Sequence, residues 1–383
     1  MKTKIPALDG LRGIAVLWVM LHNGSFFAVL DFDTVLGGNL WRLLHAGWLG
    51  VQLFFVLSGF LITGILLDAK EHKSGNIFKN FYMRRVLRIF PVYYVTLIAI
   101  ALFAYFQAGV SVWADSIADH MTWFALYMNN WLHPFVHFKL GHFWSLAVEE
   151  QFYLLWPFVV IFVSRQILLK ICLLLIAFAM AFRFGMALID PQFAVADEGA
   201  YLWTPCRIDA LAVGALLAIV IREYPSHQNL GRIVNLATIA SLLYCLAVIY
   251  LKYTFSSVEA DWTMLNQTVA AILFGACIYH CITPAGIGMV RDLFVRAVSV
   301  SWLRTCGKYS YAMYIFHAPM ALLLKEKVYP GINVHVGGGN FFGVPYFFVV
   351  DTILFVACTF GLAIVSWMLI EKPFLDAKKK WEL

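Results

Sequence analysis

Ten long apolar runs constrain this chain more than any other feature of its sequence. A helix of about 20 apolar residues spans the hydrocarbon core of a bilayer and satisfies its own backbone hydrogen bonds. We therefore predict an all-α integral membrane protein, a bundle of about ten transmembrane helices, with residues 119–131 as an amphipathic or re-entrant extra. The runs lie at about 13–30, 47–67, 87–106, 143–163, 167–189, 208–221, 233–251, 264–282, 310–324 and 346–370.

The composition supports the same class of protein. The chain is 62% hydrophobic and 13% charged, whereas soluble domains are roughly 45–50% apolar and about 25% charged. This difference excludes a soluble enzyme, a disordered chain and a collagen-like fibre. The net charge of +6 does not indicate nucleic-acid binding, because the basic residues lie at the expected membrane edges.

The distribution of basic residues predicts the orientation. If the N-terminus is cytoplasmic, 21 of the 28 Lys and Arg residues fall on the cytoplasmic side. Such a bias follows the positive-inside rule and predicts that both termini are cytoplasmic. The basic residues left outside are Arg42, Lys139, Arg183, Arg207, Lys252, Lys325 and Lys327.

The domain organisation is expected to be simple. We expect one transmembrane domain over residues 1–383, with no cleaved signal peptide and no appended extracytoplasmic domain. The seven cysteines are odd in number and scattered through apolar runs, so they do not form a disulfide framework. Cys277 and Cys281 flank His280, but they are interpreted as small buried thiols and no metal site is expected.

Ionisable residues inside apolar runs are costly and indicate function. Asp9 and Arg12 open the first run, and His22 follows about ten residues later. At 1.5 Å per residue, His22 lies roughly 15 Å from Arg12, near the bilayer midplane. An imidazole there can serve as a base near neutral pH. The alternative is a histidine whose hydrogen bonds a neighbouring helix satisfies.

A second cluster lies in HFWSLAVEEQFYLLWP. Ser145, Glu149 and Tyr153 share one stripe of a helix, and Glu150 points to another side. Glu149 and Glu150 are the candidate catalytic carboxylates, and Glu149 is the one expected to meet His22 across an interior cavity. The alternative is a structural hydrogen-bond network between helices.

Three arginines form a third cluster in FYMRRVLRIFPVYY. Arg84, Arg85 and Arg88 lie at helical spacing, and guanidinium groups bind phosphates with two parallel hydrogen bonds. The alternative is anchoring to anionic lipid.

Weaker signals come from residues nearer the ends of other runs. Gly59 and Gly214 predict close approach of helix backbones. Arg207 and Asp209 are near enough in sequence to neutralise each other. The remaining polar residues of this group are Ser58, Tyr311 and His317, and for His317 a structural role is favoured.

With these residues identified, the sequence resembles the membrane acyltransferase-3 family, which O-acetylates bacterial surface polysaccharides and related acceptors. The resemblance implies about ten helices in the bacterial cytoplasmic membrane, acyl-CoA as donor (favouring acetyl-CoA) and a hydroxyl of a carbohydrate or lipid-linked acceptor. The matching motifs, in order, are LDGLRG with the downstream His, FFVLSGFLI, RRVLRIFP, FWSLAVEEQFYLLWP, RIDALAVGALLA, GKYSYAMYIFH and EKPF.

The resemblance also implies residue roles. His22 would be the catalytic histidine and Glu149 its acidic partner, while Arg85 and Arg88 would hold the CoA end. Arg12 would be the arginine of the family's Arg…His motif. Nine residues separate Arg12 from His22 here, one fewer than usual. Either the helix starts after Arg12 or the two side chains are not aligned.

The expected chemistry is acyl transfer with His22 as base and Ser145 or Tyr153 steadying the oxyanion. Direct transfer and an acyl-enzyme remain equally compatible with the sequence. A transporter or flippase of a lipid-linked saccharide is the competing class, although the inverted repeats common in such folds are not visible. A membrane scaffold would not need buried His, Glu and Arg residues.

Overall fold

The computed structural model is almost entirely helical. Its one pair of strands among the described residues is a two-residue antiparallel match, β1 (Asn340–Phe341) with β2 (Val344–Pro345). The structure describes residues 5–24, 46–72, 75–106, 118–136, 141–196, 198–224, 229–254, 263–283, 288–325, 340–341, 344–377 and 381.

Each of the ten predicted runs coincides with a long helix. The bounds differ most at the first, third and ninth runs, where the helices begin at Pro6, Ile77 and Ser301 rather than near residues 13, 87 and 310. Proline suits the first turn of a helix because its missing N–H is not needed there. The long helices are α1 (Pro6–Asn23), α3 (Trp48–Glu71), α4 (Ile77–Phe106), α8 (Phe143–Phe162), α9 (Arg165–Ile189), α11 (Thr204–Glu223), α12 (Leu230–Thr254), α13 (Thr263–Ile282), α15 (Ser301–Leu323) and α17 (Tyr346–Ser366).

Short elements connect these helices. Residues 119–131, predicted as one extra segment, contribute to two short helices, α6 (Met121–Ala125) and α7 (Asn129–Val136). The amphipathic helix α14 (Met289–Val298) was not predicted, because it lacks a long apolar run. The other short elements are the π-helices η2 (Gln192–Ala196) and η5 (Trp367–Glu371) and the helices α10 (Gly199–Leu202) and α18 (Lys372–Ala377).

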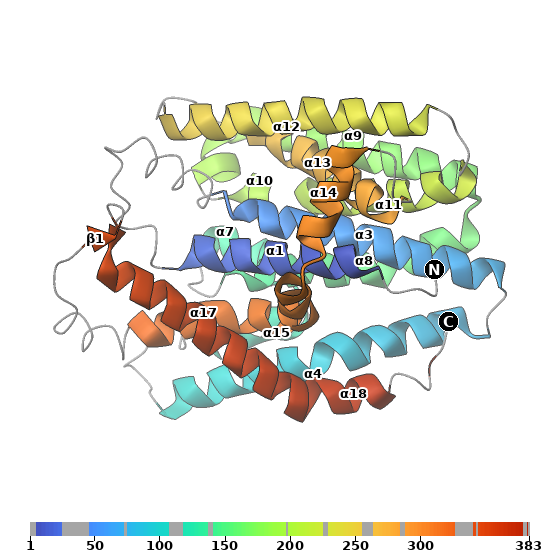
Figure 1. Cartoon of the computed structure of the whole chain (residues 1–383). Helices are drawn as coiled ribbons and strands as arrows, with labels where there is room; N and C mark the ends of the chain where they lie inside the picture. The colour runs from blue at the N-terminus through green and yellow to red at the C-terminus, as the bar shows by residue number, and fades with distance from the viewer. Residues whose placement is uncertain are drawn as a thin grey trace.

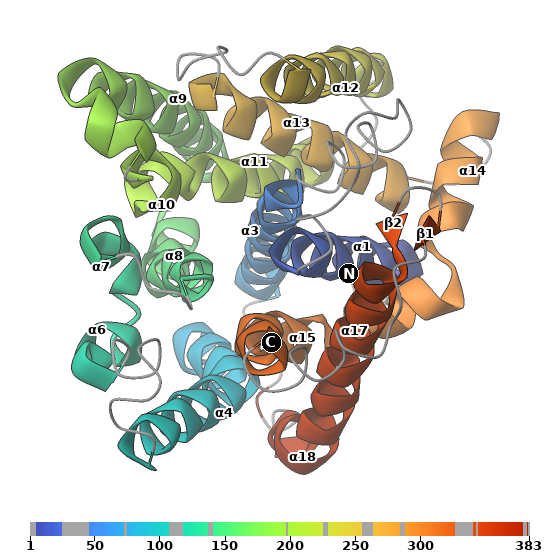
Figure 2. The same ribbon diagram turned by 90° about the vertical axis from the view of Figure 1, so that its left-hand side faces the viewer.

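Eight helices of the described chain are long and apolar enough to cross a bilayer, so the chain is a multi-pass membrane protein. The two long helices outside this group are α1 and α15, which carry several charged residues. They pack against each other inside the bundle, where α1 lies at the centre of the end view (Figure 2). Neighbouring helices therefore shield them. α1 begins and α18 ends at the same end of the bundle (Figure 1).

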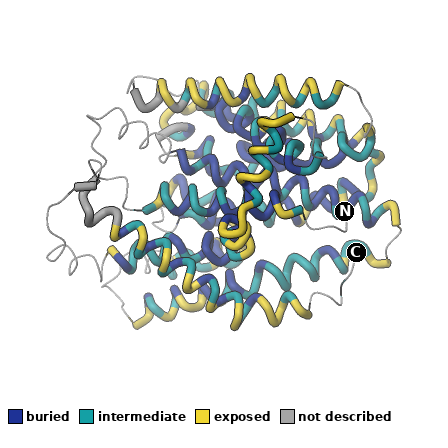
Figure 3. Tube along the Cα trace, viewed as in Figure 1, coloured by how far each residue is buried: buried dark blue, intermediate teal, exposed yellow. Residues whose placement is uncertain are grey.

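Burial separates central helices from peripheral ones. In the apolar window of α3, 78% of the residues are buried, against 11% for α12. The outer sides of the peripheral helices instead expose large apolar residues such as Leu236 and Phe162 (Figure 3). Lipid covers such a surface without the free-energy penalty that water would impose.

Glycines bring the central helices together. A Cβ at Gly59 of α3 would overlap the backbone of Leu211 in α11, and one at Gly214 would overlap the backbone of Val56 in α3. The predicted close approach is therefore confirmed, and the two glycines serve one interface. Gly13 and Gly307 form the equivalent contact between α1 and α15.

Candidate active site

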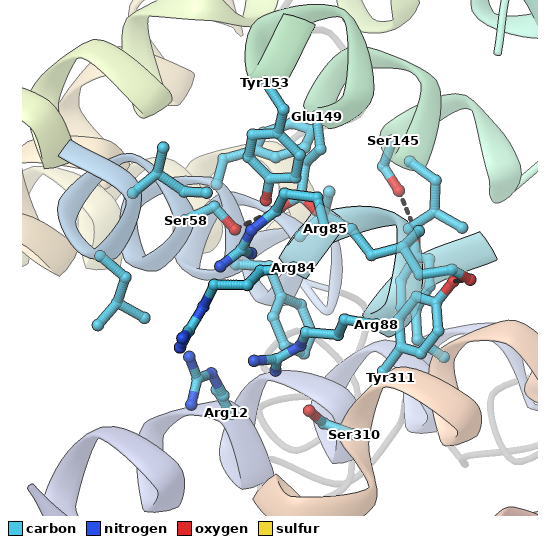
Figure 4. A pocket seen from close by; sticks show the side chains of 18 of the residues that line it. Arg12, Ser58, Arg84, Arg85, Arg88, Ser145, Glu149, Tyr153, Ser310 and Tyr311 are labelled. Atoms are coloured by element: carbon cyan, nitrogen blue, oxygen red, sulfur yellow. Dashed lines mark hydrogen bonds between the residues drawn. The ribbon is translucent and has the colours of Figure 1, made fainter. Parts of the chain in front are cut away.

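A cavity of about 290 Å³ lies between α4 and the helices α1, α3, α8 and α15; we call it the basic cavity. Glu149 is the one carboxylate among its lining residues. Figure 4 shows the guanidinium groups of Arg12, Arg84 and Arg88 converging there. The arginines that line it are Arg12, Arg84, Arg85 and Arg88, as the sequence predicted for a donor site.

Two of these arginines are tied to the protein by hydrogen bonds. The Arg12 Nη1 donates to Asp9 Oδ1 over 3.1 Å within α1. The Arg84 Nη1 donates to the backbone oxygen of Trp381 over 3.1 Å, which holds the end of the described chain against α4. The guanidinium group of Arg12 retains further N–H donors.

The other two arginines have more donors free for a ligand. Arg85 lies over the rings of Phe81 and Tyr153, each 5.7 Å from its guanidinium carbon, and its buried Nε has no hydrogen-bond partner. Arg88 makes no hydrogen bond or ion pair within the part of the chain that the structure describes. Converging cations with unused donors indicate an anionic ligand with several charges.

Glu149 is held on the wall of the basic cavity. Its carboxylate accepts a hydrogen bond of 2.7 Å from the Ser58 hydroxyl, and Tyr153 bonds to it as well. The predicted stripe of Ser145, Glu149 and Tyr153 lines this cavity together. Glu150, the next residue of α8, is not among the residues that line this cavity.

A second cavity of about 250 Å³ lies next to the first; we call it the histidine cavity. Its lining includes His22 from α1, His133 from α7 and His142 just before α8. Its aromatic walls and its remaining polar groups come from five helices. These residues are Asn23, Trp48, Trp144, Glu198, Tyr201 and Tyr314.

His22 lies in the last turn of α1. A Cβ at Gly47, which directly precedes α3, would overlap the Cβ of His22, so the two residues are at the same level. Because α1 begins at Pro6, Arg12 and His22 share one continuous helix, ten residues apart. Their side chains are rotated by about 80° and separated by roughly 15 Å along the axis. They line different cavities, which decides between the two alternatives that the short spacing left open.

The predicted contact between Glu149 and His22 is not formed. Glu149 lines the basic cavity and His22 the histidine cavity, and the hydrogen bonds of Glu149 go to Ser58 and Tyr153. The two cavities share two lining residues, Val51 and Tyr314. We call these two residues the partition.

Arg207 and Asp209 do not pair with each other. Asp209 instead forms an ion pair of 2.9 Å with Arg183, and both side chains are fully buried. Arg183 had been counted as an outside residue, but it lies within α9. The Arg207 Nη2 donates to Gln52 over 2.6 Å. Neither Arg207 nor Asp209 lines either cavity, so neither contacts the proposed substrates directly.

Arg207 supports the aromatic wall of the histidine cavity from behind. Its guanidinium carbon lies 5.3 Å from the ring centroid of Trp144 and 4.7 Å from that of Tyr201. Both rings line the cavity. Cation–π contacts of this kind fix the orientation of aromatic rings.

Sequence reasoning did not assign His142, Tyr314, His133 or Tyr201. His142 opens the motif HFWSLAVEEQF, and Tyr314 lies three residues before His317. The sequence signal that could have identified His142 and Tyr314 is that each lies beside the apolar core of its motif. The seven cysteines are free thiols, and the described residues contain no group of three or more His, Cys, Asp or Glu suited to a metal ion.

The bundle of apolar helices encloses a basic cavity and a histidine cavity, and comparison with known proteins gives the class and the family of the chain. The family model for an acyltransferase domain matches residues 5–372. The chain belongs to the acyltransferase-3 family.

Several named relatives align over 96% of this chain. The Bacillus subtilis protein YrhL, a proposed peptidoglycan O-acetyltransferase, is 30% identical over 54% of its own length. The peptidoglycan O-acetyltransferase OatA of Listeria monocytogenes is 28% identical over 55% of its length, and the O-acetyltransferase OatA of Staphylococcus aureus is 23% identical over 57%. The chain therefore spans about half the length of these relatives. No solved structure matches the chain.

Proposed function

We propose that this chain is an acyl-CoA-dependent O-acyltransferase of the bacterial cytoplasmic membrane. It moves an acyl group, most simply acetyl, to a hydroxyl of a surface carbohydrate or lipid-linked saccharide. The observation that carries this proposal is the pair of adjoining cavities, one basic and one lined by histidines, with a shared partition of Val51 and Tyr314.

The basic cavity is the proposed donor site. Four arginines face one carboxylate there, and the phosphates of CoA would neutralise their charge. Arg85 and Arg88 have unused donors for this purpose. Arg12 lies near the start of α1 and Arg84 bonds to Trp381 near the end of the chain, so with both termini in the cytoplasm acyl-CoA would reach these arginines from that side.

The histidine cavity is the proposed acceptor site. The thioester end of the donor reaches the partition, and the acceptor hydroxyl lies beside His22. His22 takes the hydroxyl proton as the oxygen bonds to the thioester carbonyl carbon. The carbon–sulfur bond breaks, and the proton passes to the leaving thiolate. The products are an acyl ester and free CoA.

Ser145 and Tyr314 are the proposed donors for the oxyanion. Their hydroxyl oxygens lie 2.5 Å apart, and both groups line the basic cavity at its boundary with the histidine cavity. Each hydroxyl has a single proton and also lies beside the backbone oxygen of His142, so these protons turn to the oxyanion while the two oxygens keep their places. Glu149, bonded to Ser58 and Tyr153, orders the donor side instead of the base.

Purified protein in lipid nanodiscs, supplied with acetyl-CoA labelled in the acetyl group, tests the proposal. We expect alkali-labile label on a saccharide, with β-1,4-linked N-acetylglucosamine tetramer as the first acceptor because the relatives are named as peptidoglycan enzymes. His22→Ala is the inactive control. Saccharide flux across proteoliposomes without acetyl transfer or acetyl-CoA hydrolysis would instead establish the transporter.

A further inference from the structure

We propose that His142 is a second histidine of the acceptor site and that its Nδ1 accepts a hydrogen bond from a hydroxyl of the carbohydrate acceptor. The inference rests on the proposed function and adds a binding residue to it. It follows from the tautomer of His142, from its surroundings and from its place in the histidine cavity.

The contacts of the His142 ring fix which nitrogen carries the proton. Its Nε2 lies 3.2 Å from the backbone oxygen of Ile315 in α15. A carbonyl oxygen can only accept a hydrogen bond, so Nε2 is the protonated nitrogen. In the neutral ring, Nδ1 then carries a lone pair and can only accept.

The Nδ1 lone pair has no donor within the described protein. Nδ1 is buried and has no hydrogen-bond partner. The ring of His317, which also carries nitrogens, has its centroid 4.7 Å away. The Nδ1 of His317 faces the backbone oxygen of Tyr314 over 2.6 Å, which leaves the His317 Nε2 as an acceptor as well. Two acceptors cannot bond to each other, so the donor for His142 must come from a ligand or from water.

The position of His142 is fixed on both sides. Its backbone oxygen lies 3.1 Å from the Ser145 hydroxyl and 3.0 Å from the Tyr314 hydroxyl, which are themselves 2.5 Å apart, so the two hydroxyl protons hold these three oxygens together. Together with the contact to Ile315, these bonds tie the residue to α8 and α15. A preorganised acceptor loses little entropy when it binds a ligand.

The cavity around His142 suits a sugar. Trp48, Trp144 and Tyr201 give it flat aromatic walls, on which the apolar faces of sugar rings pack, and His22 lies in the same lining. A sugar offers hydroxyl groups as hydrogen-bond donors, and the Nδ1 of His142 lacks such a donor. Of the three histidines that line this cavity, His22 then removes the proton and His142 orients the acceptor.

The test compares His142→Phe with His142→Asn in nanodiscs. Phenylalanine keeps a planar ring without nitrogens, whereas asparagine can place an amide oxygen near the Nδ1 position. A lost hydrogen bond to a buried group costs about 1–3 kcal/mol, so we expect His142→Phe to raise the acceptor KM about 10- to 100-fold. His142→Asn should recover part of this loss, and both variants should bind acetyl-CoA like wild type.

A binding measurement without turnover accompanies the kinetics. Quenching of tryptophan fluorescence by N-acetylglucosamine tetramer, in the absence of donor, reports the saccharide Kd through Trp48 and Trp144. His280→Phe is the matched control, because His280 contacts Thr238 between α12 and α13 and lines neither cavity. Its acceptor KM and saccharide Kd should equal those of wild type.

The outcomes separate the two proposals. Wild-type protein that transfers no acyl group to a saccharide contradicts the proposed function. Wild-type transfer together with an unchanged acceptor KM and saccharide Kd in His142→Phe contradicts the role of His142 alone. A loss in His142→Phe that asparagine does not relieve also contradicts it, since only the shape of the site would then matter.

Discussion

The charged residues of α1 divide their work between two cavities. Arg12 belongs to the basic cavity and His22 to the histidine cavity, although they share one helix. A rotation of about 80° between them directs each side chain to its own site. The chemistry at one residue therefore need not depend on the charge at the other.

His22 is expected to affect the chemical step and not the binding of the donor. His22→Ala and His22→Gln should lower kcat by about 10²–10⁴-fold, because the acceptor hydroxyl loses its base. The Kd for acetyl-CoA should not change, since His22 lies outside the basic cavity. Single-turnover transfer and equilibrium binding measure the two quantities. Wild-type turnover in both variants would place the base elsewhere, with His317 as the next candidate.

Arg88 is expected to bind the donor. Arg88→Ala should raise the KM for acetyl-CoA about tenfold, because a charge-assisted hydrogen bond contributes about 1.5–3 kcal/mol. Wild type should likewise bind dephosphorylated CoA more weakly. Arg296→Ala, an exposed arginine of α14, is the control and should keep the wild-type KM. If Arg88 only anchors lipid, its variant loses folded protein and the remainder keeps wild-type kinetics.

Glu149 and His22 are expected to act independently. Glu149→Gln should raise the KM for acetyl-CoA, because the carboxylate orders Ser58 and Tyr153 on the donor side. Since the two residues line different cavities, the free-energy changes of the single variants should add in the double variant. The kcat/KM values of wild type, the two single variants and the double variant measure this sum. A double variant no worse than His22→Ala would show a coupled pair.

At the scale of helices, close packing decides where glycine is needed. Gly214→Ala should lower the thermal stability of the protein in detergent, because the new Cβ would overlap the backbone of Val56. Gly361→Ala in α17 is the matched control, since nothing lies within 4 Å of its Cβ position. That change should be neutral or stabilising, because alanine is the better helix former by about 1 kcal/mol. Equal shifts in both melting temperatures would contradict the packing argument.

Long apolar runs predicted the helices, because a segment inside a membrane must satisfy its own backbone hydrogen bonds. They missed the starts of α1, α4 and α15, because their first turns carry charged residues such as Asp9, Lys79 and Arg304. The arginines, Ser58 and Glu149 were found because charge inside an apolar run is conspicuous. The pair of Arg183 with Asp209 could not be found this way, since it depends on how α9 packs against α11.

The partition between the cavities also could not be predicted from the sequence, because it depends on how helices pack. Val51 is an ordinary apolar residue of α3, and Tyr314 one of several tyrosines in its motif. Only the packing of α3 against α8 and α15 gives them a shared position. His142 was likewise hidden, because its role follows from contacts with Ile315 and Tyr314 rather than from its sequence neighbours.

At the scale of the whole molecule, the proposed reaction has donor and acceptor enter separate cavities, so the acyl group would have to pass Val51 and Tyr314 to join them. The partition should therefore select short acyl chains. Val51→Ala should raise the kcat/KM for butyryl-CoA relative to acetyl-CoA about tenfold, because apolar sites discriminate by about 1–3 kcal/mol for each methylene. Val19→Ala removes the same two methyl groups from a residue that lines the histidine cavity alone, so it should leave this ratio unchanged. Competition between the two donors, followed by mass spectrometry of the esterified saccharide, measures the ratio directly. Equal ratios in the two variants would mean that the acyl group does not pass this partition.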